Sequence, residues 1–401
     1  MKTHRTTDSK IENGTGRSTI LDALRAIAIL LVLGRHTYIS QTLTRIGWCG
    51  VDLFFVISGF LISGLLFQEY KRFGSIRLKT FWLRRGLKIY PAFYVYTLVT
   101  AILFPTLFHW TLSARRVLTD VTFLSSYYEG LSGHTWSLAV EEHFYIFLPL
   151  LLVLLIRVWP NKRDPFALIP MIFGLFATAS LLFRMAAKPA FFTDYYKFMF
   201  PTHMRIDALF CGVTIGYLFH FRPRILARIA DWKFLIAGAM LLTPVYFIEA
   251  PYPWMYTWGL TCTYLGFGCV LTWAVHQRPP QGKLTALPIK LLAKIGFYSY
   301  SIYLWHWLII EDFGTFIRHQ CLSTGHPFVW SPTLQTWQWP VFAFVSVVVG
   351  IAMAKVVEVP VLRLRDRWFP SRTRLSDLTN EPNLDRAPIQ PQRAMAVAQG
   401  Q

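Results

Sequence analysis

The residues best suited to chemistry in this sequence lie inside an apolar run. Residues 21–40 read LDALRAIAILLVLGRHTYIS, in which Arg25 and His36 interrupt a stretch suited to a lipid bilayer. Eleven positions are about three turns of an α-helix, so the two side chains fall on nearly one face, roughly 16 Å apart along the axis. An ionisable group inside a bilayer costs several kcal/mol unless it meets a partner or a polar cavity. A cation and a titratable base on one face therefore indicate a functional site.

The alternative for this stretch is structural. Arg25 would then extend to the inner headgroups, and His36 would only bond a neighbouring helix. Because two buried polar groups share one face, one functional explanation for both is favoured over a separate structural explanation for each. Arg35 lies about 100° around the helix from His36, and we expect it to reach the outer headgroups.

A second group of polar residues opens the segment HTWSLAVEEHFY, which begins at position 134. Glu141 and Glu142 enter an apolar helix behind Trp136 and Ser137. Adjacent residues point about 100° apart, so one carboxylate is expected to face a cavity and the other a helix neighbour or water. The alternative is an ordinary helix N-terminus, where acidic side chains complement the macrodipole.

Basic residues cluster in the segment RLKTFWLRRGLKIYP, which we expect to be a loop on the inner side, before the third span. Arg84, Arg85 and Lys88 stand among aromatic residues there. This density suits a phosphate-rich ligand, because guanidinium and ammonium groups bind phosphate oxygens. The alternative is the positive charge that inner loops of membrane proteins carry without any ligand.

Further polar residues lie in two later helices. In the segment YSYSIYLWHW, His306 follows Tyr303, and a lone histidine among aromatic residues is more often structural. Arg205 and Asp207 open another apolar run and are expected to pair with each other or with neighbours. The chain has no Walker loop, GxSxG elbow or HExxH motif. A histidine that takes a proton from a hydroxyl, with a carboxylate to orient it, suits acyl transfer to an alcohol.

The elements that carry these residues are predicted to be membrane-spanning helices. Of the 401 residues, 54% are hydrophobic and only 15% are charged, against about 25% in soluble domains. Several apolar runs reach the roughly 18–20 residues that cross a bilayer, so we expect an all-α, polytopic helical bundle. Gly212 and Gly216 form a GxxxG motif that favours close helix packing. About ten spans are predicted, near 20–40, 50–70, 88–108, 137–158, 164–187, 203–220, 232–250, 254–275, 290–312 and 336–357.

The loops between these spans predict an orientation. Most Lys and Arg residues fall on the side of the N-terminus, and few, Arg184 among them, fall on the other. This asymmetry predicts that both termini are inside. It also accounts for the net charge of +19 without a nucleic acid, because the cations face anionic lipid or anionic cytosolic ligands.

The sequence divides into three parts. Residues 1–19 are expected to be a cytoplasmic tail without a secretory signal, 20–362 a transmembrane domain, and 363–401 a basic, disordered tail. The outer segment 109–136 is expected to include an interfacial helix. The five cysteines form no CxxC pair, so we interpret them as buried helix thiols rather than as a disulfide framework or a metal site.

Six motifs, in order, resemble the acyltransferase-3 family of bacterial integral membrane acyltransferases. The resemblance covers about residues 18–362. The matching stretches are LDALRAIAILLVLGRH, GVDLFFVISGFLIS, FWLRRGLKIYP, TWSLAVEEHFY, YSYSIYLWH and the sequence Glu358-Val359-Pro360. Members of this family acylate, most often acetylate, sugars of surface polysaccharides, lipopolysaccharide, peptidoglycan and other exported molecules.

The resemblance implies roles for the residues named above. The donor would be acyl-CoA, most often acetyl-CoA, bound from the cytoplasm. His36 would be the general base with Arg25 essential beside it, and Glu141 would support the histidine or the acceptor, with Glu142 next to it. The cations near the CoA phosphates would be Arg84, Arg85 and Lys88. The residues that would contact or support the acceptor are Trp136, Ser137, Arg205, Asp207, Tyr303 and His306.

The resemblance also implies a cellular setting. The acceptor would be a hydroxyl of a glycan or glycolipid at the outer face of the bacterial inner membrane, with no metal and no nucleic acid involved. Some family members carry an extracellular hydrolase-like domain, which this sequence lacks. The chain is therefore expected to act directly, as a homo-oligomer or with a separate periplasmic partner. The rival functions are a transporter or flippase, and a non-catalytic subunit of a glycan export machine.

The sequence departs from the family pattern at four positions. Lys88 stands where the family commonly has arginine, which keeps the charge but loses the bidentate fork. Ala23 replaces a glycine, His143 a glutamine, and Arg35 an apolar residue. None of these changes removes a predicted catalytic group.

Overall fold

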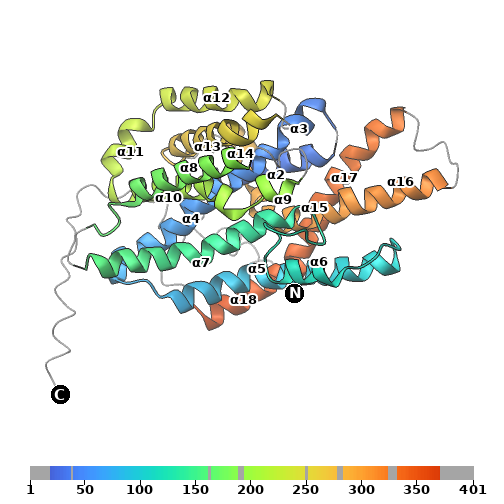
Figure 1. The fold of residues 1–401 in the computed structure, drawn as a ribbon, viewed down its shortest axis with the longest axis horizontal. Coiled ribbons are helices and arrows are strands. Elements are labelled where there is room, and N and C mark those ends of the chain that lie inside the picture. Colours follow the sequence, from blue (N-terminus) through green and yellow to red (C-terminus); the bar gives the residue numbers. More distant parts are fainter. Residues whose placement is uncertain are drawn as a thin grey trace, which may run out of the picture.

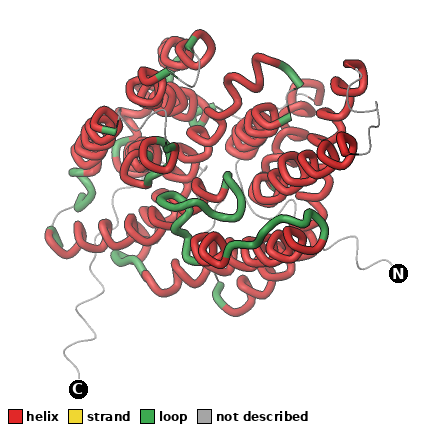
Figure 2. The backbone as a smooth tube through the Cα atoms, turned by 45° about the vertical axis from the view of Figure 1, so that its right-hand side comes forward, coloured by secondary structure: helices red, strands yellow, loops and turns green. Residues whose placement is uncertain are grey.

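The computed structural model describes seven stretches of the chain, and these stretches are helical throughout, with short loops (Figure 2). No strand occurs in the described stretches, so the prediction of an all-α fold is confirmed. Other predictions, for the N-terminal tail and for most of the C-terminal tail, fall outside the described residues. The described residues are 19–37, 39–160, 164–187, 194–248, 252–277, 283–323 and 332–370.

Each of the ten predicted spans overlaps a helix of the structure (Figure 1). The longer helices are α2 (Thr19–His36), α4 (Gly50–Phe73), α5 (Leu78–Thr106), α7 (Thr135–Val158), α8 (Ile169–Ala186), α10 (Ile206–Phe221), α12 (Trp232–Phe247), α13 (Leu260–Ala274), α14 (Lys283–Phe297) and α17 (Pro332–Met353). The shorter α-helices are α3 (Gln41–Ile46), α6 (Ala114–Val121), α9 (Tyr195–Phe198), α11 (Pro223–Ile229), α15 (Ser299–Trp307), α16 (Gly314–Ser323) and α18 (Val359–Trp368). Three π-helical segments are η4 (Met255–Gly259), η5 (Leu308–Phe313) and η7 (Ala354–Glu358).

Five of the described helices are long and apolar enough to cross a membrane. The helix α2 has a comparable length, but Asp22, Arg25 and Arg35 make it more charged than an ordinary span. The predicted count of about ten spans and the orientation of the termini stay predictions. The five helices are Gln41–Phe73, Leu78–Thr106, Thr135–Val158, Ile169–Ala186 and Trp339–Trp368.

The basic segment expected to be a loop is instead part of a helix. Gly74 ends α4 with a φ of 66°, the left-handed conformation that commonly terminates helices. The next helix, α5, begins already at Leu78, and Pro91 lies inside it. Arg84 and Arg85 therefore sit on one turn of a helix and Lys88 on the next, and their directions follow from its geometry. The helix expected in the outer segment 109–136 is present as α6.

Glycines bring α4 and α10 into close contact. A Cβ atom on Gly59 would overlap the carbonyl oxygen of Leu209, and one on Gly212 would overlap the carbonyl oxygen of Val56. Gly216 faces Ser63 one turn later. The GxxxG motif thus has the close-packing role predicted for it, because small residues let helix backbones approach.

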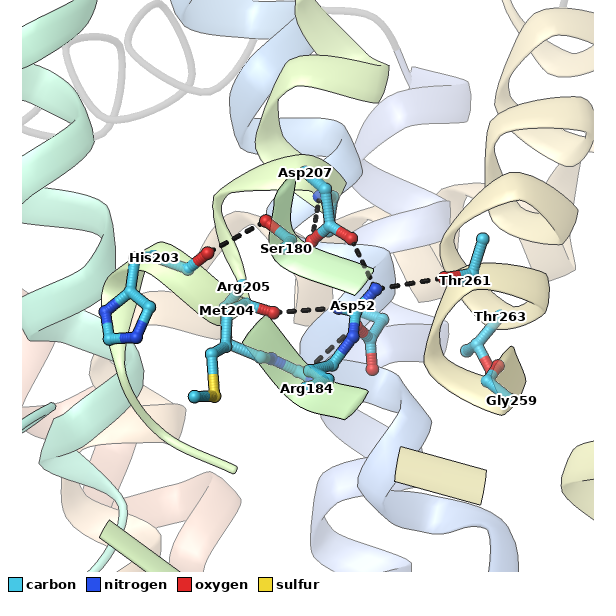
Figure 3. Close-up of polar contacts among 11 residues, drawn as sticks. Asp52, Ser180, Arg184, His203, Met204, Arg205, Asp207, Gly259, Thr261 and Thr263 are labelled. Carbon is cyan, nitrogen blue, oxygen red and sulfur yellow. Dashed lines mark hydrogen bonds and ion pairs between the residues drawn. The ribbon is translucent and has the colours of Figure 1, made fainter. Parts of the chain in front are cut away.

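Two buried ion pairs tie the same region together (Figure 3). Arg205 Nη2 lies 3.0 Å from Asp52 Oδ1 on α4, and Arg184 Nη2 lies 2.9 Å from Asp207 Oδ2. All four side chains are at most 2% exposed. Arg184 also donates to Thr261 on α13. Arg205 and Asp207 thus pair with neighbours and not with each other, and the pairs join α4, α8, α10 and α13.

A second group of helices flanks α2. The helix α14 lies so close to α2 that a Cβ on Gly296 would overlap the carbonyl oxygen of Asp22. The chain continues from α14 through α15 into η5, and α17 packs behind α15, where Gly350 faces Ile302. The consecutive elements α15 and η5, residues 299–313, form a column that runs beside α2. We call it the 299–313 column.

The close approach of α4 and α10 predicts a specific cost for added volume. Replacing Gly212 with alanine forces the two backbones apart, and overpacking of this kind costs about 1–3 kcal/mol. Gly174 on α8 is the matched control, because nothing lies within 4 Å of its added Cβ. We expect Gly212→Ala to lower the midpoint of thermal unfolding in detergent and Gly174→Ala to leave it unchanged or higher. Equal midpoints for the two variants would contradict the close packing.

The buried ion pairs predict a second stability difference. Asp52→Ala leaves the Arg205 guanidinium buried without its partner, which typically costs about 3–5 kcal/mol. The exposed pair Arg116–Glu129 is the control, because such pairs contribute about 0–1 kcal/mol. Denaturation in mixed micelles measures the free energy of unfolding of both variants, Asp52→Ala and Arg116→Ala. A similar loss of stability in both variants would show that the buried pair contributes no more to stability than the exposed pair.

Candidate active site

His36 is held by a carboxylate that comes from the other end of the chain. Its Nδ1 lies 2.8 Å from Oε1 of Glu311 in η5. A carboxylate accepts a hydrogen bond and does not donate one, so His36 carries a proton on Nδ1 and keeps Nε2 free as a base. The two side chains are 22% and 33% exposed, so both can be reached from outside the bundle. A histidine oriented by an acid in this way can take a proton from a hydroxyl.

Aromatic and imidazole rings surround His36. Its ring centroid lies 5.4 Å from that of His306 and 5.2 Å from that of Trp307. His134 stacks on Trp307 and lies 5.2 Å from His306. Both His134 and His306 are buried and contact backbone carbonyls of α15 through one ring nitrogen. The structural role predicted for His306 agrees with this burial, and its ring also touches the candidate base. In the described stretches, no three His, Cys, Asp or Glu side chains are placed to hold a metal ion.

A cavity lies between α2, α4, α5, α7 and α15. Its empty volume is about 1190 Å³, part of which is open solvent. The α4 wall is largely apolar, and the other walls carry charged and hydroxyl groups. Several residues singled out in the sequence meet here, namely Arg25, Arg85, Lys88, Ser137, Glu141 and Glu142.

Arg25 and His36 both face the 299–313 column. Arg25 Nε donates to Ser299 Oγ at 3.1 Å, at the beginning of α15, and His36 contacts Glu311 near the end of the column. This is the shared helix face expected from their spacing. Only Arg25 lines the cavity, so the cation and the base lie at different depths along one face.

The adjacent glutamates have different partners. Glu141 accepts hydrogen bonds from Ser58 Oγ at 2.6 Å and from Tyr145 Oη at 2.7 Å. Glu142 is buried and accepts a hydrogen bond from Tyr90 Oη at 3.1 Å. Both line the cavity, although their spacing predicts that one of them faces a helix neighbour or water. The carboxylate that contacts His36 is Glu311, and the role implied for Glu141, support of the histidine or of the acceptor, stays a prediction.

The three cations at the start of α5 separate into two directions. Arg85 and Lys88 line the cavity, and the Arg85 guanidinium lies 3.9 Å above the ring of Tyr145. Arg84 points to α18 instead, where Nη2 lies 2.9 Å from Asp366 and Nη1 bonds the carbonyl of Phe369. Adjacent residues on a helix differ by about 100°, which accounts for the division.

The residues predicted to contact or support the acceptor fall into two groups, one at the cavity and one behind it. Ser137 and Tyr303 line the cavity and contact each other, with their hydroxyl oxygens 2.5 Å apart. Trp136 stacks on Phe200 and lies against the Arg205 guanidinium. Trp136, Arg205 and Asp207 are therefore part of the packing behind the cavity, next to the buried ion pairs.

An anchored loop sets the position of His134. Asp120 accepts hydrogen bonds from the Leu131 N–H and the Thr135 hydroxyl, both at 2.8 Å. A Cβ on Gly130 would overlap the same carboxyl group, so only glycine fits there. Burial raises the pKa of Asp120 to about 6. These contacts hold the residues before α7 in place, and with them the ring of His134.

Sequence reasoning missed Glu311, Asp52 and the buried state of Arg184. Glu311 ends an apolar run, and an acidic residue in such a run is by default a candidate for function. That rule would have found it. Arg184 lies at the end of a predicted span, where a cation resembles ordinary flanking charge, and nothing in its neighbours indicates the distant partner Asp207.

Comparisons with known proteins identify the family of the chain. The model of the acyltransferase-3 family, described as an acyltransferase domain, matches residues 19–355. Peptidoglycan O-acetyltransferase OatA of Listeria monocytogenes is 26% identical over 340 residues, 79% of this chain and 52% of that protein. O-acetyltransferase OatA of Staphylococcus aureus is 29% identical over 316 residues, 72% of this chain and 50% of that protein. A further Staphylococcus aureus protein, provisionally named an O-acetyltransferase, is 31% identical over 312 residues, 73% of this chain and 50% of that protein.

The extent of these matches sets what they show. The chain spans about half the length of the curated relatives it matches. No solved structure matches it. The family match covers most of the chain, including α2, the cavity and η5. The protein therefore belongs to the acyltransferase-3 family of membrane acyltransferases.

Proposed function

We propose that the protein transfers an acyl group, most often acetyl, from acyl-CoA to a hydroxyl of an exported glycan or glycolipid. The single observation that carries the proposal is the contact between His36 and Glu311, a base oriented by a carboxylate at a position open to the outside of the bundle. A transporter or flippase would not require this arrangement, and the family is one of acyltransferases.

The chemistry follows from the free nitrogen of His36. Its Nε2 takes the proton of the acceptor hydroxyl while the oxygen attacks the thioester carbonyl, and Glu311 stabilises the imidazolium that forms. A C–O bond forms, the C–S bond breaks, and the CoA thiolate leaves and takes a proton from water. The imidazolium returns its proton to solvent. General base catalysis of this kind contributes about 10²–10⁴-fold in rate.

The cavity supplies a site for an anionic donor. Arg25, Arg85 and Lys88 line it, and the stacking of Arg85 on Tyr145 holds the guanidinium in a fixed plane. Planar guanidinium groups bind phosphate oxygens with two hydrogen bonds at once, which suits the phosphates of CoA. The apolar α4 wall, with Phe54, would contact the acyl group and the uncharged arm of the donor.

The acceptor would be a sugar hydroxyl at the outer face of the bacterial inner membrane. One relative is named for O-acetylation of peptidoglycan, which supports a glycan as the acceptor class. The chain spans about half the length of that relative, so the acceptor class is part of the proposal.

The paired base and carboxylate predict the effect of two substitutions. His36→Ala removes the base and should abolish O-acylation of exported glycans. Glu311→Gln keeps the shape but cannot stabilise the imidazolium, so acylation should fall by about 10²-fold or more. Mass spectrometry of glycans from cells with and without the gene measures both. Glu129→Gln, an exposed glutamate on the outer loop, is the control. Full acylation by His36→Ala, with the variant present in the membrane, would rule out the proposed base.

The opposite directions of Arg84 and Arg85 predict unequal effects on donor binding. Arg85→Ala should weaken binding of acetyl-CoA by about ten- to a hundredfold, because it removes a charge-assisted hydrogen bond inside the cavity, worth about 1.5–3 kcal/mol. Arg84→Ala should change it much less, since Arg84 contacts α18. Titration calorimetry with acetyl-CoA and the purified variants in lipid nanodiscs measures both dissociation constants. Equal losses would contradict the assignment of the cavity as the donor site.

A further inference from the structure

The donor cavity and the candidate base are separated by a layer of side chains. Ser137 and Tyr303 line the cavity, whereas His36 does not. Between them lie Tyr303 itself, His134 and His306, which we call the Tyr303 layer. The ring centroid of His306 lies 5.3 Å from that of Tyr303 and 5.4 Å from that of His36. The rings of Tyr303 and His306 thus lie one behind the other between the cavity and His36, and a thioester in the cavity lies on the opposite side of them from His36.

The layer is closed by hydrogen bonds as well as by packing. The Tyr303 hydroxyl contacts Ser137 Oγ at 2.5 Å and donates to the backbone carbonyl of His134 at 3.1 Å. The Nδ1–H of His306 donates to the carbonyl of Tyr303. Tyr303, His134 and His306 are 7%, 3% and 0% exposed. In the state that the structure describes, these buried side chains therefore lie between His36 and the cavity.

We infer, on the basis of the function proposed above, that Tyr303 determines whether the acyl group goes to a hydroxyl acceptor or to water. An activated acyl group beside a base is hydrolysed when water reaches both, and enzymes avoid this loss by excluding water. The Tyr303 layer keeps the thioester from His36 until it opens. Tyr303 is thus a positioning residue: it does not exchange a proton with the acceptor, but it controls when the reacting groups meet.

The reaction that the layer prevents can be written in full. When no acceptor is present and the layer is open, His36 Nε2 takes a proton from water, and the water oxygen attacks the thioester carbonyl. A C–O bond forms, the C–S bond breaks, and acetate and CoA are released, with the thiolate taking a proton from solvent. Each hydrogen bond that closes the layer opposes this opening by about fivefold, the factor that corresponds to ~1 kcal/mol.

The inference is tested with acetyl-CoA as the only substrate. The full chain is purified in lipid nanodiscs, and release of free CoA thiol is followed without an acceptor. Tyr303→Phe keeps the ring but removes both contacts of the hydroxyl, so we expect hydrolysis five- to thirtyfold faster than in the wild type. Ser137→Ala removes one of these contacts and should make hydrolysis about fivefold faster than in the wild type. Tyr94→Phe, which removes a hydroxyl that donates to a carbonyl outside the cavity, should leave the rate within twofold.

A double variant and a binding measurement separate the possible outcomes. Adding His36→Ala to Tyr303→Phe should return hydrolysis to the wild-type rate, because the base is needed on the far side. If Tyr303→Phe binds acetyl-CoA normally and hydrolyses it no faster, the role of the layer is overturned while the proposed function stands. If the wild type does not bind acetyl-CoA, the proposed function itself fails. An acetyl group found on Tyr303 or Ser137 by mass spectrometry would also overturn the inference, because the acyl group would then cross the layer covalently.

Discussion

A charged group inside an apolar bundle needs a partner on another helix, and the rest of this structure depends on that constraint. Asp52 meets Arg205, and His36 meets Glu311, in each case across a long separation in sequence. An unpartnered charge at such a position would cost several kcal/mol. Each pair therefore fixes the depth and rotation of two helices at once. The buried pairs hold the frame of α4, α8 and α10, and the His36 pair aligns α2 with the 299–313 column.

Features that depend on local spacing could be predicted from the sequence. The apolar runs indicated helices that the structure contains, with boundaries shifted by several residues. The 11-residue separation of Arg25 and His36 predicted one shared face, and both do contact the same column. Gly212 and Gly216 predicted close packing without naming the partner, which is α4. In each case the repeat of the α-helix alone carries the information.

Features that depend on contacts between distant segments could not be predicted in this way. The periodicity around His36 contains nothing about Glu311, which is 275 residues away. Arg84 and Arg85 are identical side chains at adjacent positions. Only the position of α18 decides which of them pairs with Asp366. The segment 77–91 looked like a loop because it is basic and aromatic, yet α5 begins at Leu78 and continues through Pro91. Charge was the misleading signal there, and backbone geometry decided the outcome.

The π-helical turn of η5 makes the length of this segment as important as its composition. A π-turn accommodates one residue more than an α-helix would over the same rise. Removing one residue from residues 308–310 would let the segment close as an α-helix and turn Glu311 by about 100°. Glu311 would then point away from His36 although both residues of the pair were still present in the sequence. In alignments of related chains, a gap of one residue before this glutamate would mark a changed partner for the histidine.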